Sequence, residues 1–435
     1  MALKSLKHKY KLPFLRPPKR PAELSIPSDF LCPISLDLMK DPVTLPTGIT
    51  YDRKSIEYWL DAGNRTCPVT NQSLLVTTAD DLIPNHSIRR VIQDWCVAHR
   101  SDGVERIPTP KTPVTTPQVL KTLSEISAAC RRGDGVRCAE LVAVLRIWAE
   151  ENERNKRCIL SNNAAGVLAA AFLCFPSENF LTSFAEMWNP DSDELSLLEL
   201  CSPESLNSIV SILRNGSVEG RLNTVMVVKD LLAVACTRET LAAAMIARTE
   251  GLVEEVAKLI IYPISSQATK ASLVAAHHLA ASQATKLAGM GLVSVLVEIM
   301  VDAEKSICEK AMAVLERILE SEAGRERAAA HALAVPVLVK KMFRVSDLVT
   351  EMAVSAIWKL CRSDRDGGGE KRRGEECAVE ALRVGAFQKL LMLLQVGCSE
   401  NTKEKASELL KLLNGYRASG ECVESVDLKG LKRSF

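Results

Sequence analysis

The sequence predicts a mostly α-helical protein, in which a small α+β unit precedes a long solenoid of helical repeats. Aromatic residues make up 4% of the chain and apolar residues 47%, and this balance favours helices packed on helices over extensive sheets. Roughly 300 residues repeat one apolar template at intervals near 40 residues, as multi-helix repeats do. Ahead of these repeats, turn residues separate short apolar runs, as in a compact unit with strands.

The overall composition limits the class of protein. A chain of 435 residues is too long for one ordinary core, so two domains or an extended array are expected. A net charge of +2 argues against a nucleic-acid-binding protein, because such proteins neutralise phosphates with many cations. The 14 cysteines form no CxxC pair and no secretory leader is recognisable, so we expect the reducing cytoplasm, with the nucleus as a second location. The longest apolar run, AAGVLAAAFLCF, is about half the length of a membrane span, and no span is expected.

Residues 1–24 form a basic segment. The first 20 residues carry seven Lys or Arg and no acid. We expect a flexible basic arm, and a nuclear localisation signal or a transit peptide are the alternatives. Pro13, Pro17 and Pro18 weigh against one continuous amphipathic helix in this segment.

Residues 25–99 have the pattern of a small α+β domain. From Asp41, DPVTLPTGITYDR predicts a strand, a Pro-Thr-Gly turn and a second strand, and therefore a hairpin. Asp52 is placed to cap a helix over RKSIEYWLDAG, in which apolar residues recur four apart. Asn85 is placed to cap a further helix. The buried stripe expected along that helix consists of Ile88, Val91, Ile92 and Trp95.

Two loops in this domain begin like zinc knuckles but lack the second thiolate. In LCPISLDLMKDPV, Ser35 stands where the metal partner of Cys32 would be, and in TCPVTNQ, Thr70 stands where the partner of Cys67 would be. We therefore expect no metal and no cofactor. A domain this small still needs bracing beyond its apolar core, so polar side chains are expected to hold the loops. The candidates for this bracing are Ser35, Asp52, Arg53, Thr70 and Asn85.

Residues 100–118 include several prolines and threonines with little to bury, and we expect an extended linker there. Residues 119–420 follow with helical repeats, in which one apolar template recurs at steps of 40, 42 and 52 residues. The copies are GLVEEVAKLI at Gly251, GLVSVLVEIM at Gly291, LAVPVLVKKM at Leu333 and GAFQKLLMLL at Gly385. A second periodic segment precedes each copy, so each repeat holds several helices that stack on their neighbours. The glycines are expected at helix boundaries.

The longest step between copies contains a charged, glycine-rich insertion, DRDGGGEKRRGEE, at residues 364–376. We expect this insertion to be a mobile loop. Residues 421–435 are expected to form a C-terminal tail. The repeats resemble armadillo repeats, a class of α-solenoid whose concave face suits protein partners.

The first domain resembles a specific family. The segments FLCPISLDLMKDPVTLPTGITYDRKSIEYWL, TCPVTNQSL and LIPNHSIRRVIQDW are similar to the U-box, the zinc-free, RING-like domain of ubiquitin ligases, and they cover residues 25–99. A U-box followed by armadillo repeats is similar to a large plant family of ubiquitin ligases that is often tied to immune and stress signalling. The resemblance implies a RING-type ubiquitin transferase.

The resemblance also implies a mechanism without a nucleophile on this chain. In the family, the two loops and the helix between them bind a conjugating enzyme that carries ubiquitin as a thioester, and the armadillo repeats bind the substrate. At the matching positions, Ile34, Trp59 and Pro68 are implied as contacts with the conjugating enzyme. The thioester is then oriented towards a substrate lysine, so that catalysis comes from orientation.

One position departs from the family pattern. Related U-boxes often place an arginine that bridges the carrier and ubiquitin where this chain has Asn71, with Gln72 beside it. An amide can bridge by hydrogen bonds but lacks the charge and the five-donor fork of arginine. Asn71 therefore keeps open the alternative of a non-catalytic armadillo scaffold with a decayed U-box. A second alternative is a nuclear transport or transcription adaptor that uses the solenoid and the basic arm. The residues assigned to the U-box scaffold are Tyr51, Asp52, Arg53 and Asn85.

Overall fold

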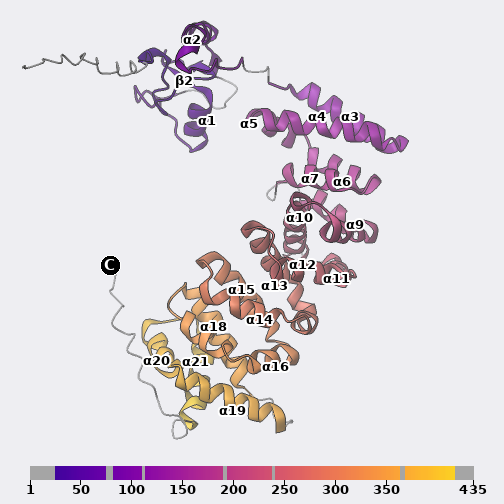
Figure 1. Cartoon of the computed structure of the whole chain (residues 1–435), viewed down its shortest axis with the longest axis vertical. Coiled ribbons are helices and arrows are strands. Elements are labelled where there is room, and N and C mark those ends of the chain that lie inside the picture. Colours follow the sequence, from indigo (N-terminus) through magenta and orange to yellow (C-terminus); the bar gives the residue numbers. More distant parts are fainter. Residues whose placement is uncertain are drawn as a thin grey trace, which may run out of the picture. The chain divides into compact units, whose positions relative to one another are not determined.

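The structure is a computed structural model that describes residues 25–74, 82–109, 113–189, 194–237, 241–362 and 368–416. The chain divides into two compact units, Met1–Pro113 and Val114–Phe435 (Figure 1). Three of the predicted segments lie outside the described residues: the arm at residues 1–24, residues 364–367 of the insertion, and the tail at residues 421–435.

The division between the units falls within residues 100–118, the stretch expected to be a linker. Both ends of this stretch are packed, although the sequence suggested that it had little to bury. Ile107 is buried in the core of the first unit, and its carbonyl accepts a hydrogen bond from Gln93 Nε2 at 3.2 Å. At the other end, the N–H of Val114 donates to Asn155 Oδ1 at 2.8 Å.

The first unit contains a three-stranded antiparallel sheet in the order β2-β1-β3. Its strands are β1 (Pro42–Thr44), β2 (Thr50–Asp52) and β3 (Ile83–Pro84). Val43 on β1 lies opposite Tyr51 on β2 and Pro84 on β3. Gly48 turns the chain between β1 and β2 with a φ of 81°, which glycine adopts without a steric penalty. The predicted hairpin is confirmed.

Two helices pack with this sheet. The helical segments are η1 (Ser28–Phe30), α1 (Arg53–Asp61), α2 (His86–Ala98) and η3 (Arg100–Asp102). The stripe predicted along α2 is partly wrong, because Val91 is exposed to solvent. The buried positions of α2 are instead Arg89, Ile92 and Cys96, which recur three and four residues apart on one face. Arg89 can lie among these buried residues because its guanidinium pairs with the carboxylate of Asp41.

The second unit is helical throughout its described residues. Its helices are α3 (Thr116–Arg132), α4 (Gly135–Glu151), α5 (Glu153–Leu160), α6 (Ala164–Cys174), α7 (Glu178–Glu186), α8 (Glu194–Leu198), η4 (Glu199–Cys201), α9 (Pro203–Asn215), α10 (Val218–Thr237), α11 (Leu241–Arg248), α12 (Leu252–Ile261), α13 (Ser266–Gly289), α14 (Leu292–Asp302), α15 (Lys305–Ile318), α16 (Glu322–Ala330), α17 (Ala334–Lys341), α18 (Asp347–Cys361), α19 (Gly368–Arg383), α20 (Ala386–Val396) and α21 (Glu400–Gly415).

These helices stack as three-helix repeats (Figure 1). The helices α16, α17 and α18 make one repeat, and α19, α20 and α21 make the next. The predicted templates form the middle helix of each repeat: α12, α14, α17 and α20. The helix α13 is kinked at Gln283, so its second part is the first helix of the repeat that contains α14. The third helices pack on one another in sequence, from α10 through α13, α15 and α18 to α21. Each repeat thus covers the apolar face of its neighbour, as the periodicity predicts.

The glycines at the template starts lie at helix boundaries, as predicted. Gly251, Gly291 and Gly385 precede α12, α14 and α20 with φ values of 83°, 80° and 84°. These values are left-handed, where a side chain is strained. Leu333 at the fourth copy has a φ of −92°, so that turn needs no glycine.

The predicted mobile loop at residues 364–376 is wrong for its second part. Residues 368–376 lie in α19, while residues 364–367 are outside the described residues. The physical reason is composition, because Glu, Lys and Arg are good helix formers and they outnumber the glycines in this part of the insertion.

The core of the second unit is one continuous apolar cluster. It runs from Val119 in α3 to Leu413 in α21 and consists mainly of Leu, Val, Ile and Ala. Within the described residues, no single helix is long and apolar enough to cross a membrane. Two helix pairs, α5 with α6 and α13 with α14, reach that length and apolarity only together, and they bend by 73° and 100°.

Candidate functional site

The two loops that resemble zinc knuckles share one backbone conformation. A bridge between Leu31 and Leu38 closes the first loop, residues 31–38, and a bridge between Thr66 and Ser73 closes the second loop, residues 66–73. The backbone N–H of Leu36 donates to the carbonyl of Cys32 at 2.8 Å in the first loop. The N–H of Asn71 donates to the carbonyl of Cys67 at 2.9 Å in the second. The loops are therefore matched turns, each starting at a cysteine.

Each loop places one residue in the left-handed region. Leu36 has a φ of 60° and Asn71 a φ of 54°. Asparagine tolerates this conformation, whereas leucine rarely adopts it, so the first loop stores strain of roughly 1–3 kcal/mol. The left-handed backbone at position 71 is by itself a reason for asparagine at this position.

The cysteine sulfurs act as hydrogen-bond acceptors for the loops. The N–H of Asp52 donates to Cys32 Sγ at 3.3 Å. Cys67 Sγ lies 3.0 Å from the hydroxyl of Tyr51 and accepts from Thr47 Oγ1 at 3.4 Å. Because Tyr51 and Asp52 are consecutive residues of β2, one strand holds both loops. A cross-brace of this kind joins the loops through polar contacts.

The pKa shifts of Tyr51 and Cys67 indicate which of these two groups donates the hydrogen bond between them. Burial raises the pKa of the Cys67 thiol, but hydrogen bonds from Thr47, Thr70 and Tyr51 outweigh burial and lower that pKa to about 6. Burial and the neighbouring Cys67 raise the pKa of Tyr51. The phenol therefore keeps its proton at neutral pH and donates it to the sulfur.

Carboxylates tie the first loop and the helices to the sheet. Asp52 stands at the N-cap position of α1, but its side chain makes no capping bond, so the predicted cap is wrong. Its Oδ1 accepts instead from the N–H groups of Lys40 and Asp41, at 2.8 and 2.9 Å. Asp41 Oδ2 accepts from Arg53 Nε at 2.7 Å, and Asp41 Oδ1 pairs with Arg89.

Asn85 fastens α2 to the hairpin. Its Oδ1 accepts from the N–H of Ile88 at 3.0 Å, so it caps the helix as the sequence predicted. Its Nδ2 donates to Thr44 Oγ1 at 3.1 Å. One amide side chain therefore orders both the start of α2 and strand β1.

The residues predicted to contact a conjugating enzyme lie on the loops and on α1. Ile34 in the first loop and Pro68 in the second are half-buried. Trp59 on α1 is also half-buried, and its Nε1 donates to the carbonyl of Thr66 at 2.8 Å. Trp59 thus fastens the second loop to α1 while part of its ring stays accessible. Asn71 is exposed on the same loop.

The sequence did not single out the most exposed apolar side chains of this region. Leu36 is 72% exposed, Val69 is 52% exposed, and Tyr58 on α1 is 79% exposed. Leu36 and Val69 lie on the two matched loops, beside Ile34 and Pro68 respectively. Exposed apolar side chains on two rigid loops mark a surface that a partner covers. Exposure follows from the loop conformation, which no local sequence signal revealed.

Within the described ranges, no group of three or more His, Cys, Asp or Glu side chains is arranged to hold a metal ion. The expectation that the U-box contains no zinc therefore stays a prediction from ligand spacing. Elemental analysis of the purified protein tests it.

The third helices of the second unit carry a chain of polar contacts. Lys359 Nζ donates to Glu316 Oε1 at 2.7 Å, and Ser355 Oγ donates to the same oxygen at 2.7 Å. Lys405 Nζ donates to Ser355 Oγ at 2.8 Å. Trp358 Nε1 donates to Glu408 at 2.7 Å. These contacts connect α15, α18 and α21 along one line, and their members range from the buried Ser355 to the exposed Glu408.

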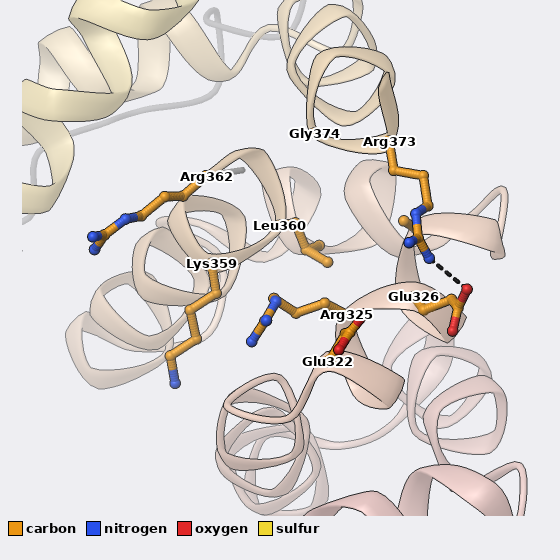
Figure 2. A pocket seen from close by; sticks show the side chains of 9 residues that line it. Glu322, Arg325, Glu326, Lys359, Leu360, Arg362, Arg373 and Gly374 are labelled. Atoms are coloured by element: carbon orange, nitrogen blue, oxygen red, sulfur yellow. Dashed lines mark ion pairs between the residues drawn. The ribbon is translucent and has the colours of Figure 1, made fainter. Parts of the chain in front are cut away.

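A small pocket lies beside this line, between α16, α18 and α19 (Figure 2). It contains the ion pair of Arg373 with Glu326, at 2.6 Å. Its free volume is about 30 Å³, far below the 300–1,000 Å³ typical of small-molecule sites. This pocket has room for water or for one side chain of a partner.

The fold and the loops define a class of protein: a RING-like module braced by polar contacts and followed by an α-solenoid. Comparisons with known families identify it further. The U-box domain family matches residues 26–101, and the family "Plant U-box protein ARM repeat region" matches residues 118–432. The chain belongs to the plant U-box proteins with armadillo repeats.

Similar proteins come from Arabidopsis thaliana. U-box domain-containing protein 21 is 40% identical over 426 residues, covering 95% of this chain and 94% of that protein. E3 ubiquitin-protein ligase PUB23 is 36% identical over 411 residues, covering 90% and 93%. E3 ubiquitin-protein ligase PUB22 is 34% identical over 449 residues, covering 92% and 97%. Ubiquitin ligase activity is thus supported at the level of the family.

Solved structures show the fold alone. A structure from a study of the interaction between cadherin and β-catenin is 16% identical, with a TM-score of 0.50, and the match covers 76% of this chain and 66% of that one. The designed armadillo repeat protein YIII(Dq)4CqI is 21% identical, with a TM-score of 0.45, over 57% of this chain and 100% of that one.

Proposed function

We propose that this protein is a ubiquitin ligase whose U-box recruits a ubiquitin-loaded conjugating enzyme while its armadillo repeats hold a protein substrate. One observation carries the proposal. Two loops of one conformation, fastened by consecutive residues of β2, present apolar side chains next to Trp59 on α1. Such a surface suits a protein partner, and a ligase that works by orientation needs no nucleophile of its own.

The proposed contacts divide into anchors and a bridge. Ile34 and Pro68 pack against the conjugating enzyme, and Leu36 and Val69 extend this contact surface on the two loops. Asn71 then hydrogen-bonds to both the carrier and ubiquitin, which restricts ubiquitin to a folded-back position. Because an amide is neutral, this restriction is weaker than one made by arginine.

The proposed substrate surface is the polar line on the third helices. Armadillo repeats suit extended protein segments, and the line across α15, α18 and α21 offers donors, acceptors and an indole along such a path. A role in plant immune or stress signalling and a location in the cytoplasm and nucleus are parts of the same proposal. A fluorescent fusion expressed in plant cells tests the location.

Ubiquitin chain assembly tests the recruiting function. Purified full-length protein is mixed with activating enzyme, ubiquitin, ATP and a panel of conjugating enzymes. The parent protein is expected to build chains, and Ile34→Ala and Pro68→Ala are expected to lower the rate at least about tenfold, as anchor truncations do. Val97→Ala is the matched control, because Val97 is an exposed apolar residue of the same domain outside the loops.

The variants distinguish a recruiting surface from a merely structural one. Trp59→Ala removes the bond to Thr66, so it is expected to lower both activity and melting temperature. For Ile34→Ala and Pro68→Ala, the melting temperature is expected to stay near that of the parent. Activity that falls only in proportion to unfolding contradicts the proposal.

The alternative of a non-catalytic scaffold rests on Asn71. If no conjugating enzyme in a broad panel supports chain assembly, the scaffold is favoured. Asn71→Arg provides the sharper comparison, because it supplies the charged fork that related U-boxes carry. We expect this variant to raise the rate with the same conjugating enzymes as the parent.

A further inference from the structure

Three cysteines converge near the start of the armadillo repeats. Cys130 lies in the last turn of α3, Cys138 lies near the start of α4, and Cys174 is the last residue of α6. The Sγ atoms of Cys130 and Cys138 are 3.7 Å apart. Cys174 influences the pKa of both Cys130 and Cys138 electrostatically. Three separate helices thus place these thiols near one another, with the Cys130–Cys138 pair in contact.

The three thiols differ in their access to solvent. Cys174 is exposed, Cys130 is half-buried, and Cys138 is fully buried. Burial is the main cause that raises the pKa of Cys130, and burial with the bond to Cys130 raises the pKa of Cys138 to about 12. The two inner thiols therefore stay protonated and react slowly with a dissolved reagent. The exposed Cys174 is the thiol that such a reagent reaches first.

The sulfur atoms of the inner pair lie close to each other, next to the connection between two helices. Cys130 and Cys138 flank the tight connection of α3 and α4, where Gly133 has a φ of 69°. Their sulfurs must approach from 3.7 Å to about 2.05 Å to form a disulfide. Residues at helix ends adjust more readily than residues in helix interiors, because they lack part of the helical hydrogen bonding.

We propose that Cys130, Cys138 and Cys174 form a reversible thiol-oxidation site that takes a small peroxide such as hydrogen peroxide. The Cys174 thiol attacks one peroxide oxygen, which breaks the O–O bond and gives a sulfenic acid and one water. The Cys130 thiol then attacks that sulfur, and the hydroxyl leaves with the thiol proton as a second water. The product is a disulfide between Cys130 and Cys174.

An exchange step moves this disulfide inward. The Cys138 thiol attacks the sulfur of Cys130 and releases Cys174 as a thiol, so the final bond joins Cys130 to Cys138. Overall, two thiols and one peroxide give one disulfide and two waters. Reduction by a dithiol reverses the sequence, as for the transient disulfides of intracellular proteins.

The chain contains a matched control pair. Cys361 and Cys377 interact electrostatically in the same unit, and they are only 3% and 4% exposed. Burial raises the pKa of Cys377 to about 11. The described contacts bring no exposed third thiol to this pair. Oxidation at the proposed site is therefore expected to precede oxidation at Cys361 and Cys377.

Differential alkylation tests the site on the full-length protein. The reduced chain is treated with dilute hydrogen peroxide, free thiols are alkylated, and peptides are analysed by mass spectrometry without reduction. The expected products are peptides that join Cys130 to Cys138 or Cys174, with no link between Cys361 and Cys377, and dithiothreitol removes them. Equal oxidation of both clusters, or free thiols at all three positions, overturns the proposal.

Cys174→Ser tests the entry step separately. The exposed position tolerates serine, and an unchanged melting temperature verifies folding. We expect the disulfide between Cys130 and Cys138 to form at least about tenfold more slowly in this variant, because the buried thiols lose their accessible partner. An unchanged rate contradicts the role of Cys174. Cys130→Ser is expected to leave Cys174 as a sulfenic acid, which a dimedone probe captures.

Discussion

The two units of this chain are stabilised by different kinds of contact. In the U-box, Asp41 holds Arg53 and Arg89, Asp52 holds the backbone before β1, and two cysteine sulfurs hold the loops. In the armadillo unit, aliphatic side chains fill a continuous core from α3 to α21. The small domain depends on individual polar groups, whereas the solenoid distributes its stability over many equivalent apolar contacts.

This difference predicts how each unit responds to substitution. Removing one member of a buried charged network leaves its partners unpaired, which is more damaging than the pairwise attraction suggests. Removing one aliphatic side chain from a stacked repeat leaves a cavity that affects that repeat and its neighbours. Hydrogen exchange resolved by peptide separates the two units in one experiment, so the predictions can be compared directly.

The largest effect is expected for Asp41→Ala. This change leaves Arg89 without its carboxylate and Arg53 with Glu57 alone, at 3.8 Å, and the side chain of Arg89 is 9% exposed. We expect the U-box to lose about 3–5 kcal/mol of unfolding free energy, while peptides of the armadillo unit keep their protection. Denaturant unfolding followed by peptide-resolved hydrogen exchange measures both.

An exposed ion pair provides the control for that change. Arg137 pairs with Glu125 and Glu140 on the surface of α3 and α4. Arg137→Ala is expected to change stability far less than Asp41→Ala, because exposed ion pairs contribute little. A small effect of Asp41→Ala, similar to that of Arg137→Ala, contradicts the view that the U-box depends on its charged network.

The next effect is expected in the other unit. Leu279 on α13 is fully buried in the solenoid core. Leu279→Ala is expected to remove about 2–4 kcal/mol by creating a cavity, with loss of protection centred on α13 and its neighbours. Protection of the U-box loops is expected to stay unchanged. A loss that spreads to the U-box would show that the two units unfold together.

The stability of the U-box is expected to depend on pH through Cys67. The pKa of Cys67 is lowered in the folded protein from 9.0 to about 6, so the folded state binds fewer protons than the unfolded state between these values. Stability therefore rises as the pH increases from 6 to 9 and is lost as the pH falls through 6. The slope between these pH values is expected to be at most about 1.4 kcal/mol per pH unit, the value for one proton.

Cys67→Ser isolates this contribution. Serine can accept the same hydrogen bonds but does not titrate in this range, so the slope of stability against pH is expected to flatten. The measurement is denaturant unfolding of parent and variant between pH 6 and pH 9. Parallel curves for the two proteins would show that the sulfur stays a neutral thiol.

The smallest effect is expected for Asn85→Ala. This change removes the cap of α2 and the bond to Thr44. The loss is expected to be about 1–2 kcal/mol, as for other N-caps. Asn85→Asp, which keeps the cap but loses the amide donor, is expected to recover part of it. Equal losses in both variants would show that the contact with Thr44 dominates.

The sequence predicted the solenoid better than it predicted the bracing of the U-box. Apolar periodicity is repeated many times, so the templates at Gly251, Gly291 and Gly385 marked helix boundaries that the structure confirms. The loop expected at the insertion is wrong for residues 368–376, because the charged residues that follow its glycines are helix formers. Local patterns thus suffice where the contacts are between adjacent repeats.

The bracing of the U-box depends on residues far apart in the sequence. Asp41 meets Arg89 across 48 positions, and Tyr51 meets Cys67 across 16. The sequence therefore could not show that the Asp52 carboxylate accepts a hydrogen bond from the backbone N–H of Lys40, before β1, instead of capping α1. The resemblance to the U-box family marked both loops through their landmark residues, and the contact residues that it implies stay a prediction. The contacts themselves became visible only in three dimensions.

Hydrogen exchange at the closing amides of the two loops tests the central claim most directly. In full-length protein dialysed against a strong chelator, the N–H groups of Leu36 and Asn71 are expected to exchange slowly, because each donates within a loop held by polar contacts. Exchange at the rate of an unstructured peptide, or slow exchange only after zinc is added, would contradict a brace made of side chains.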